Sequence, residues 1–191
     1  MKYAPQAAAD SNLPVAPQFA LPDLDGNVTK LSDFKGKWVV LEWVNHLCPY
    51  VKKHYHASHK KMQSLQNKYA QKGVIWISIC SSAPGKQGYM SPADHKRTLG
   101  RLGATPAKFL LDTQGKVGRL YSAMTTPDMR IINPQGRIVY VGAIDSKRSA
   151  NAADVSKSTN YVEQVLDAVL AGKPAPISST RAYGCSVKYA R

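Results

Sequence analysis

One apolar segment constrains this chain more than any other. Residues 38–44 contain a single charged side chain, Glu42, among apolar ones. A strand covered on one face alternates apolar and polar residues, whereas a strand covered on both faces is apolar almost throughout. The segment therefore predicts a central strand, and other elements must cover both faces of its sheet.

A helical pattern begins shortly after this strand. We predict one long helix over residues 49–71, because apolar side chains recur there at helical spacing. Pro49 suits the first helical position, and Gly73 suits the position just after a helix ends. The inner stripe consists of Val51, Tyr55, Met62, Leu65 and Tyr69.

The rest of the chain alternates strands and helices. We predict strands at 19–21, 27–30, 74–80 and 108–111, a loop at 81–90, a helix starting at Ser91, a short helix at 115–123, a strand hairpin at 129–133 and 137–141, and a last helix at 160–171. This order predicts an α/β fold with a central mixed β-sheet, helices on both faces and an N-terminal β-hairpin extension.

Length and composition favour one globular domain. The chain has 191 residues, of which 43% are hydrophobic, an ordinary share for a folded protein. We expect a flexible N-terminal segment (1–15), one domain (16–172) and a C-terminal tail (173–191). No apolar run approaches the ~20 residues that span a bilayer. Residues 1–14 lack the apolar core of a signal peptide.

The chain is strongly basic. It has 26 Lys and Arg against 12 Asp and Glu, a formal charge of +14. Such a charge suits nucleic acid, anionic membranes or small anionic substrates. The basic residues are spread along the sequence without an arm, a tail or an aromatic-interleaved stripe, so we expect neither a nucleic-acid nor a membrane partner. We favour a periplasmic or secreted protein over a cytoplasmic one, with any signal peptide absent from this chain.

Three cysteines are present, and Cys48 has the most informative position. It follows the central strand and precedes the predicted long helix, at the edge of the sheet where ligands gather. Unpaired N–H groups of a first helical turn favour a thiolate over a thiol, and the thiolate is the nucleophile. Lys52 lies one helical turn further on and adds positive charge. The alternative is a buried structural cysteine beside a solvated basic helix.

Several motifs resemble those of a known superfamily. Trp43 followed by Cys48-Pro49 is similar to the active-site turn of thioredoxin-like proteins, and Thr126-Pro127 before a strand resembles their cis-proline loop. The opening at 16–37 is similar to that of the redoxin branch that contains alkyl hydroperoxide reductase and thiol-specific antioxidant proteins. Segments 81–88 and 183–189 resemble signatures of poorly characterised members of this branch.

The resemblance implies a thioredoxin-like fold and a thiol-dependent oxidoreductase or antioxidant activity. Cys48 matches the reactive cysteine, and Pro127 matches the cis-proline that packs against the active-site thiol. Trp43, Asn45, His46, Pro49, Lys52 and Thr126 are the expected supporting residues. No cofactor is expected. The implied partners are a peroxide or disulfide substrate and an external thiol reductant such as a thioredoxin-like protein.

Two departures bear on the reaction. Thioredoxins carry a second cysteine three residues after the first, and Val51 stands there, which excludes a local dithiol cycle. Peroxiredoxins carry Pro and Thr upstream of the cysteine, where this chain has Leu41 and Asn45. Their arginine has no clear match, although Arg130 is close in sequence to Pro127. The choice between peroxide and disulfide therefore stays open.

The other two cysteines receive different roles. Cys185 lies in the tail beside Gly184 and is the candidate resolving thiol for an intermediate on Cys48. A static disulfide and a stray thiol are the alternatives. Cys80 ends a buried strand and is expected to be a packed core thiol.

Histidines open a second functional hypothesis. His46 stands two residues before Cys48. Its alternative roles are a catalytic base, a metal ligand and a polar residue of the loop. With Cys48 and Cys185 it could supply soft ligands to copper, in a metal-binding module of the same fold. We expect His54, His56 and His59 to lie on a solvated helix surface.

Overall fold

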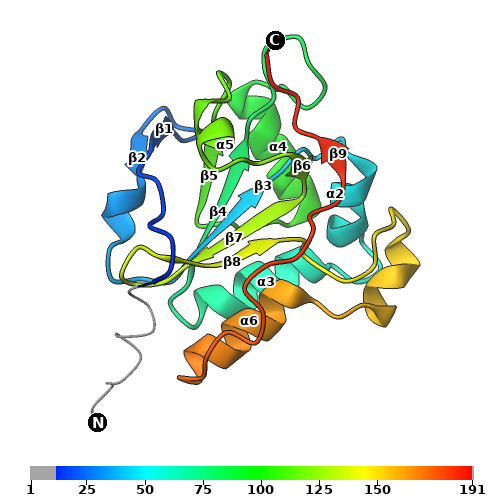
Figure 1. Ribbon diagram of the computed structural model, residues 1–191. Coiled ribbons are helices and arrows are strands. Elements are labelled where there is room, and N and C mark those ends of the chain that lie inside the picture. The colour runs from blue at the N-terminus through cyan, green and yellow to red at the C-terminus, as the bar shows by residue number, and fades with distance from the viewer. Residues whose placement is uncertain (1–11, 191) are drawn as a thin grey trace.

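The computed structural model describes residues 12–190, so most of the predicted N-terminal segment lies outside the described part. Its centre is a five-stranded sheet in the order β5-β4-β3-β7-β8 (Figure 1). The parallel strands are β3 (Val39–Trp43), β4 (Ile75–Cys80) and β5 (Lys108–Leu111). The antiparallel strands are β7 (Asp128–Ile132) and β8 (Ile138–Gly142). The predicted mixed α/β sheet is confirmed.

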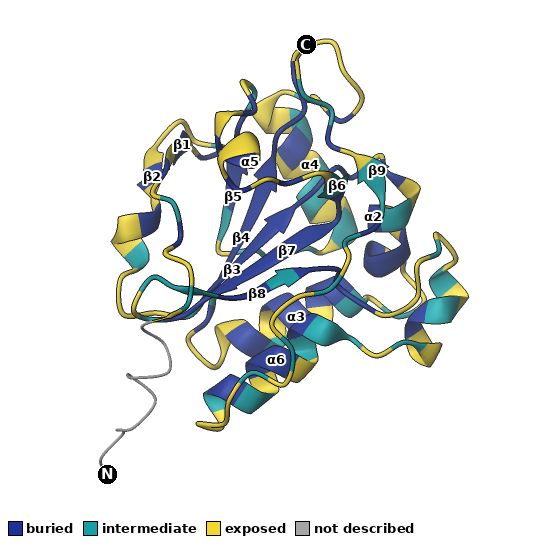
Figure 2. Ribbon diagram, viewed as in Figure 1, coloured by how far each residue is buried: buried dark blue, intermediate teal, exposed yellow. Residues whose placement is uncertain are grey.

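Elements on both faces bury the sheet, as the apolar central strand predicted. One face packs against α2 (Pro49–Tyr55), α3 (Lys61–Ala70) and α6 (Tyr161–Leu170), with Leu99 and Leu102 of α4 (Pro92–Leu102) alongside. The other face packs against α5 (Lys116–Leu120) and the N-terminal hairpin of β1 (Ala20–Pro22) and β2 (Val28–Lys30). Residues 12–190 also form two short 3-10 helices, η1 (Leu31–Phe34) and η2 (Ala152–Lys157). Figure 2 shows the sheet as the buried layer of the molecule.

A buried carboxyl group ties α2 to the sheet. Glu42 of β3 has no exposed surface. Its oxygens accept hydrogen bonds from the Tyr55 hydroxyl (2.8 Å), the Trp76 indole N–H (2.8 Å) and the Ser78 hydroxyl (3.0 Å). Burial raises the pKa of Glu42, although these hydrogen bonds oppose the shift. The one charged residue of the apolar segment is thus a polar link between strand and helix.

The prediction of one helix over 49–71 is wrong, because the chain turns between α2 and α3. The segment between Tyr55 and Met62 has no apolar side chain large enough to continue the inner stripe. Two histidine rings there accept backbone N–H groups, His56 from Ser58 (3.2 Å) and His59 from Lys61 (3.1 Å). Such local bonds compete with helix formation. Lys60 has left-handed backbone angles, with φ +46°, at the start of α3.

The C-terminal tail is mostly irregular, as predicted, but it packs along the molecule. It forms an isolated bridge with Val141 through Ser179. Its last strand, β9 (Cys185–Ser186), pairs antiparallel with β6 (Thr125–Thr126). Figure 1 shows this segment, in red, running beside β6 and close to α2. The tail therefore brings Cys185 to the end of the sheet where α2 begins.

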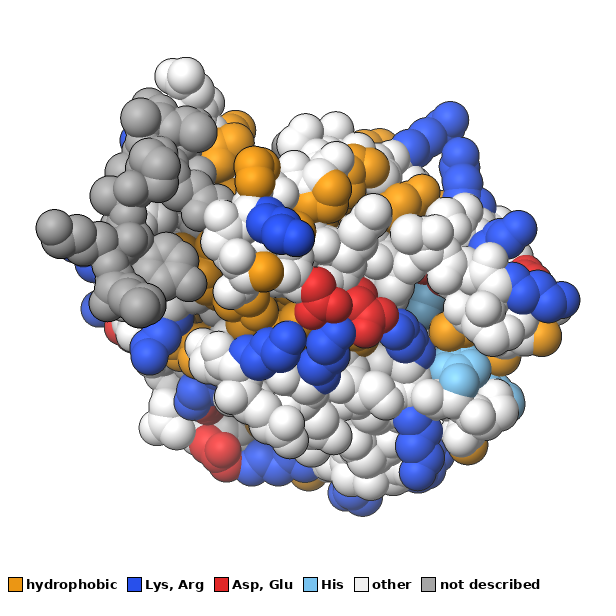
Figure 3. Space-filling view, turned by 90° about the horizontal axis from the view of Figure 1, so that it is seen from below, with side chains coloured by type: hydrophobic (Ala, Val, Ile, Leu, Met, Phe, Trp, Pro, Cys, Tyr) orange, Lys and Arg blue, Asp and Glu red, His pale blue; other side chains and the backbone are white. Residues whose placement is uncertain are grey.

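Positive charge is scattered over the surface. Figure 3 shows Lys and Arg side chains spread over the face below α3 and α6, separated by neutral ones. Part of this charge is paired, since Glu163 and Asp167 of α6 contact Lys68 at 3.0 and 2.8 Å. Among residues 12–190, no helix is both long enough and apolar enough to cross a membrane.

We predict that Lys60→Gly stabilises the protein by about 1 kcal/mol, because a left-handed residue with a side chain is strained and glycine is not. Chemical unfolding followed by circular dichroism measures this change. Ser64→Gly is the matched control: this exposed residue lies inside α3, and glycine there lowers the free energy of unfolding by about 0.5–1 kcal/mol. Equal effects of the two substitutions would contradict the assigned turn.

Candidate active site

Cys48 occupies the cap position of α2. Strand β3 ends at Trp43, and a short turn leads to Cys48, whose backbone N–H donates to the Asn45 carbonyl (2.9 Å). Pro49 takes the first helical position, as predicted. The thiol has no exposed surface and is part of the core on the α2 face of the sheet.

The tail brings a second sulfur to Cys48. The Sγ atoms of Cys48 and Cys185 are 2.6 Å apart, and both cysteines are free thiols. Cys185 is partly exposed, so it covers Cys48 on the solvent side. Gly184 permits this approach, because a Cβ at its position would lie 2.0 Å from the Thr126 carbonyl oxygen. Two cysteines separated by 137 residues thus form one site.

A proline turn completes the site. The bond between Thr126 and Pro127 is cis, the conformation that the resemblance implied. Thr126 pairs with Cys185 across β6 and β9, and its carbonyl accepts the Cys48 thiol proton at 3.3 Å. Residues from α2, β6 and β9 therefore converge around Cys48.

The two thiols have opposite pKa shifts. Burial raises the pKa of Cys48, but hydrogen bonds from the Cys185 thiol and the Val51 backbone N–H outweigh it and lower this pKa below the ordinary thiol value. Burial, followed by contact with Cys48, raises the pKa of Cys185 to about 11. Cys48 is therefore the more acidic thiol of the pair, and Cys185 is the less acidic one.

A buried ionic cluster anchors the tail next to Cys185. The Lys53 ammonium contacts the Asp145 carboxylate at 3.0 Å, and both side chains are buried. It also donates to the Lys147 carbonyl (2.6 Å) and the Tyr183 hydroxyl (3.1 Å), and Tyr183 in turn donates to Asp145. No pattern in the sequence predicted this cluster, because its members lie far apart along the chain. Its only sequence signal was Tyr183 within the tail motif.

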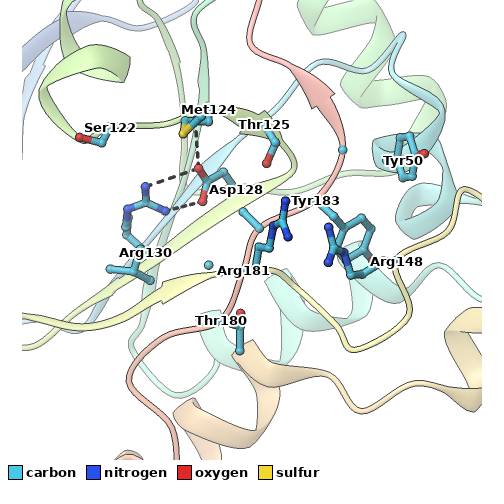
Figure 4. A pocket seen from close by; sticks show the side chains of 14 residues that line it. Tyr50, Ser122, Met124, Thr125, Asp128, Arg130, Arg148, Thr180, Arg181 and Tyr183 are labelled. Atoms are coloured by element: carbon cyan, nitrogen blue, oxygen red, sulfur yellow. Dashed lines mark hydrogen bonds and ion pairs between the residues drawn. The ribbon is translucent and has the colours of Figure 1, made fainter.

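A hollow of about 530 Å³ lies beside the thiols (Figure 4). Tyr50 of α2, Thr125 of β6 and Gly184 of the tail line its side next to the cysteines. The buried ion pair of Asp128 and Arg130 also lines it. Figure 4 shows the side chains of Arg148 and Arg181 at the same hollow. The site therefore has a solvent-filled approach on its tail side.

Two of the predicted supporting residues, Trp43 and Lys52, do not face Cys48, and neither does Arg130. Trp43 and Arg130 lie on the opposite face of the sheet, where the guanidinium stacks over the indole at 5.6 Å. Arg130 is also bound to Asp128 and to the Tyr121 carbonyl (2.9 Å). Lys52 is exposed and lines a separate cavity between α2 and α4. The positive charges expected near the thiolate therefore point elsewhere.

Asn45 and His46 shape the turn before Cys48. The Asn45 side chain accepts the Leu47 N–H (2.9 Å) and donates to the Gln87 carbonyl (3.2 Å), so it joins the active-site turn to the 81–88 loop. His46 is buried between Tyr55 and Phe109, with ring centroids at 5.0 and 5.9 Å. Burial lowers the pKa of His46 to about 3, so the ring is neutral.

The copper hypothesis fails on geometry. Within residues 12–190, no three His, Cys, Asp or Glu side chains are grouped to hold a metal ion, so His46, Cys48 and Cys185 do not form a ligand set. The predicted surface position of His54 is also wrong. His54 is fully buried next to Asp145, and burial lowers its pKa to about 4. Cys80 is buried, as predicted, and burial raises its pKa.

The mixed sheet, the helix-capping cysteine and the cis-proline turn define a thioredoxin-like redoxin. A family model described as the AhpC/TSA family matches residues 14–141. The chain belongs to this family.

Solved structures support the same fold. An uncharacterized conserved protein from Geobacillus kaustophilus is 31% identical, with a TM-score of 0.78 over 93% of this chain and 92% of that one. A hypothetical protein from Sinorhizobium meliloti is 24% identical, with a TM-score of 0.76 over 93% and 94%. A protein assigned as the thiol:disulfide interchange protein DsbE from Chlorobium tepidum is 28% identical, with a TM-score of 0.53 over 68% and 82%. No curated protein matches the chain.

We predict that one thiol of the reduced protein ionises below the ordinary thiol range and two ionise above it. The lowered pKa of Cys48 and the raised pKa values of Cys80 and Cys185 dictate this order. Ultraviolet thiolate absorbance against pH measures the steps. Cys48→Ser removes the low step, whereas Cys80→Ala leaves it in place. A low step that survives Cys48→Ser would assign the thiolate to another cysteine.

We predict that Tyr183→Phe destabilises the protein by about 1–2 kcal/mol, because Lys53 and Asp145 lose a buried hydrogen-bond partner. Thermal or chemical unfolding measures the loss. Tyr50→Phe is the matched control: Tyr50 contacts the Tyr183 ring at 5.9 Å, and its hydroxyl has no hydrogen bond to the described residues. Losses of the same size in both variants would mean that the hydrogen bonds of the Tyr183 hydroxyl do not anchor the tail.

Proposed function

We propose that this protein is a thiol–disulfide oxidoreductase, with Cys48 as the nucleophile and Cys185 as the resolving thiol. The observation that carries the proposal is the 2.6 Å separation of two free thiols whose pKa values move in opposite directions. A low-pKa thiol attacks disulfides as its anion, and a neighbouring thiol then closes the cycle.

The cycle has two balanced steps. The Cys48 thiolate attacks one sulfur of the substrate disulfide, the sulfur–sulfur bond breaks, and the first substrate sulfur leaves as a thiolate, which takes the proton that Cys185 loses in the next step. Cys185 then loses its proton and attacks the Cys48 sulfur, which releases the second substrate thiol and forms the Cys48–Cys185 bond. Two electrons have passed to the substrate. An external thiol reductant restores the two protein thiols.

Disulfide exchange is better supported than peroxide reduction. Leu41 and Asn45 stand where peroxiredoxins carry Pro and Thr, and the Asn45 side chain is engaged by Leu47 and Gln87. Arg130 lies on the other face of the sheet, bound to Asp128. No hydrogen-bond donor from these positions faces Cys48 to activate a peroxide. The similarity to a protein assigned as thiol:disulfide interchange protein DsbE favours the same class of reaction.

Access and location follow from the same proposal. Cys48 has no exposed surface, so a substrate reaches it after β9 and Cys185 move aside. Some solved structures of similar fold are described as secreted or exposed proteins, among them a disulfide oxidoreductase from Mycobacterium tuberculosis. The periplasmic or secreted location therefore stays our prediction.

The test is a redox assay on variants of the three cysteines. We expect the reduced protein to convert a small disulfide to thiols with formation of a Cys48–Cys185 bond, seen by peptide mass spectrometry. Cys48→Ser abolishes the reaction, because the nucleophile is gone. Cys185→Ser stops it at a mixed disulfide on Cys48. Cys80→Ala, a buried thiol outside the site, is the control and reacts as the parent does.

Hydrogen peroxide provides the opposing arm of the test. We expect Cys48 to be oxidised by peroxide no faster than a free cysteine at the same degree of ionisation. Rapid, Cys48-dependent peroxide consumption would replace the disulfide assignment with a peroxidase one. Reaction with neither oxidant would overturn the redox proposal itself.

A further inference from the structure

The hollow beside Cys185 carries uncompensated positive charge. Three arginines and one aspartate line it, and the pairing of Asp128 with Arg130 leaves Arg148 and Arg181. Both of these side chains are exposed. Neither forms a hydrogen bond or ion pair with the part of the chain that the structure describes. Unpaired guanidinium groups at one hollow favour carboxylate ligands, which they bind with two parallel hydrogen bonds.

The hollow ends next to the redox pair on the side of Cys185. Gly184 and Thr125 line it, and each directly adjoins a residue of the site, Cys185 and Thr126. Consecutive Cα atoms are ~3.8 Å apart, so the part of the hollow that Gly184 lines lies next to Cys185. The hollow has a volume of about 530 Å³, which suits a small molecule better than a folded protein partner.

The geometry points to a carboxylate-bearing small thiol as the reductant, which docks at Arg148 and Arg181 and attacks Cys185 of the oxidised protein. This inference rests on the proposed function of the Cys48–Cys185 pair, and it specifies the chemical class of the thiol that reduces the pair. Cys185 is the sulfur that a molecule in solvent can reach, since Cys48 has no exposed surface.

The exchange balances without a further reagent. The external thiolate forms a bond to the Cys185 sulfur, the Cys48–Cys185 bond breaks, and Cys48 leaves as a thiolate. A second external thiolate attacks the sulfur of the first, which releases a small disulfide and leaves Cys185 to take a proton. The more acidic thiol is the better leaving group, and Cys48 is the more acidic of the two.

The test compares three thiols of different charge on the oxidised protein: 3-mercaptopropionate, 2-mercaptoethanol and cysteamine. Appearance of the Cys48 thiolate gives the rate for each. In the Arg148→Gln, Arg181→Gln double variant we expect the rate with 3-mercaptopropionate to fall about tenfold, since each exposed charge contact changes the equilibrium several-fold. We expect the rate with cysteamine not to fall. In the parent protein, higher salt reduces the difference between the rates with 3-mercaptopropionate and with cysteamine.

The Lys35→Gln, Lys37→Gln double variant is the matched control. These two lysines are exposed and lie near η1, outside the hollow, and the variant loses the same two charges. If this variant slows the reaction with 3-mercaptopropionate as much as the arginine variant does, the preference for an anionic thiol arises from the overall charge of the protein, and the inference is wrong. Both variants remove exposed side chains only, and circular dichroism checks that they fold.

Mass spectrometry of the quenched reaction supplies the second readout. A mixed disulfide on Cys185 supports the inference, and one on Cys48 overturns it. This test can fail without failure of the proposed function. A protein that forms its Cys48–Cys185 bond but shows no preference among the three thiols would keep the proposed redox role, and only the inferred reductant would be wrong.

Discussion

The contact between Cys48 and Cys185 is the constraint on which the site depends. It joins the start of α2 to the end of the chain, and the sulfur separation of 2.6 Å requires both segments to be held in place. The sheet holds α2 through Glu42 and Tyr55. The tail is held by β6 and by the ionic cluster at Tyr183. Each half of the site therefore has its own polar anchor in the core.

The pKa difference between the thiols arises from this contact more than from the helix. Helix α2 has only seven residues, so its aligned peptide dipoles are few. Ionisation of Cys48 is favoured by the Cys185 thiol and the Val51 N–H, whereas Lys52 is exposed at a separate cavity. Moving the tail away therefore changes both the exposure of Cys48 and its ionisation, which couples substrate access to reactivity.

Local patterns in the sequence predicted most of the fold. Apolar runs gave the buried strands, and Ser91-Pro92 marked the start of α4, where the Ser91 hydroxyl accepts the Asp94 N–H as a cap. The break between α2 and α3 was missed, because it depends on histidine side chains that compete with the helix backbone. The burial of Lys53 and His54 was missed as well, since their partners Asp145 and Tyr183 lie far away in sequence.

The candidate site was also predicted only as far as local sequence patterns reach. Cys48 was identified from its place between strand and helix, a local feature, and the proximity of Cys185 was only a hypothesis because long-range pairing leaves no local pattern. Arg130 shows the opposite case: it is close to Pro127 in sequence, yet strand alternation turns it to the other face, over Trp43. Arg130 is therefore not positioned as the arginine of a peroxidase site, although it is close to the proline turn in sequence. An exchange reaction, which needs only the two sulfurs, is what the remaining residues favour.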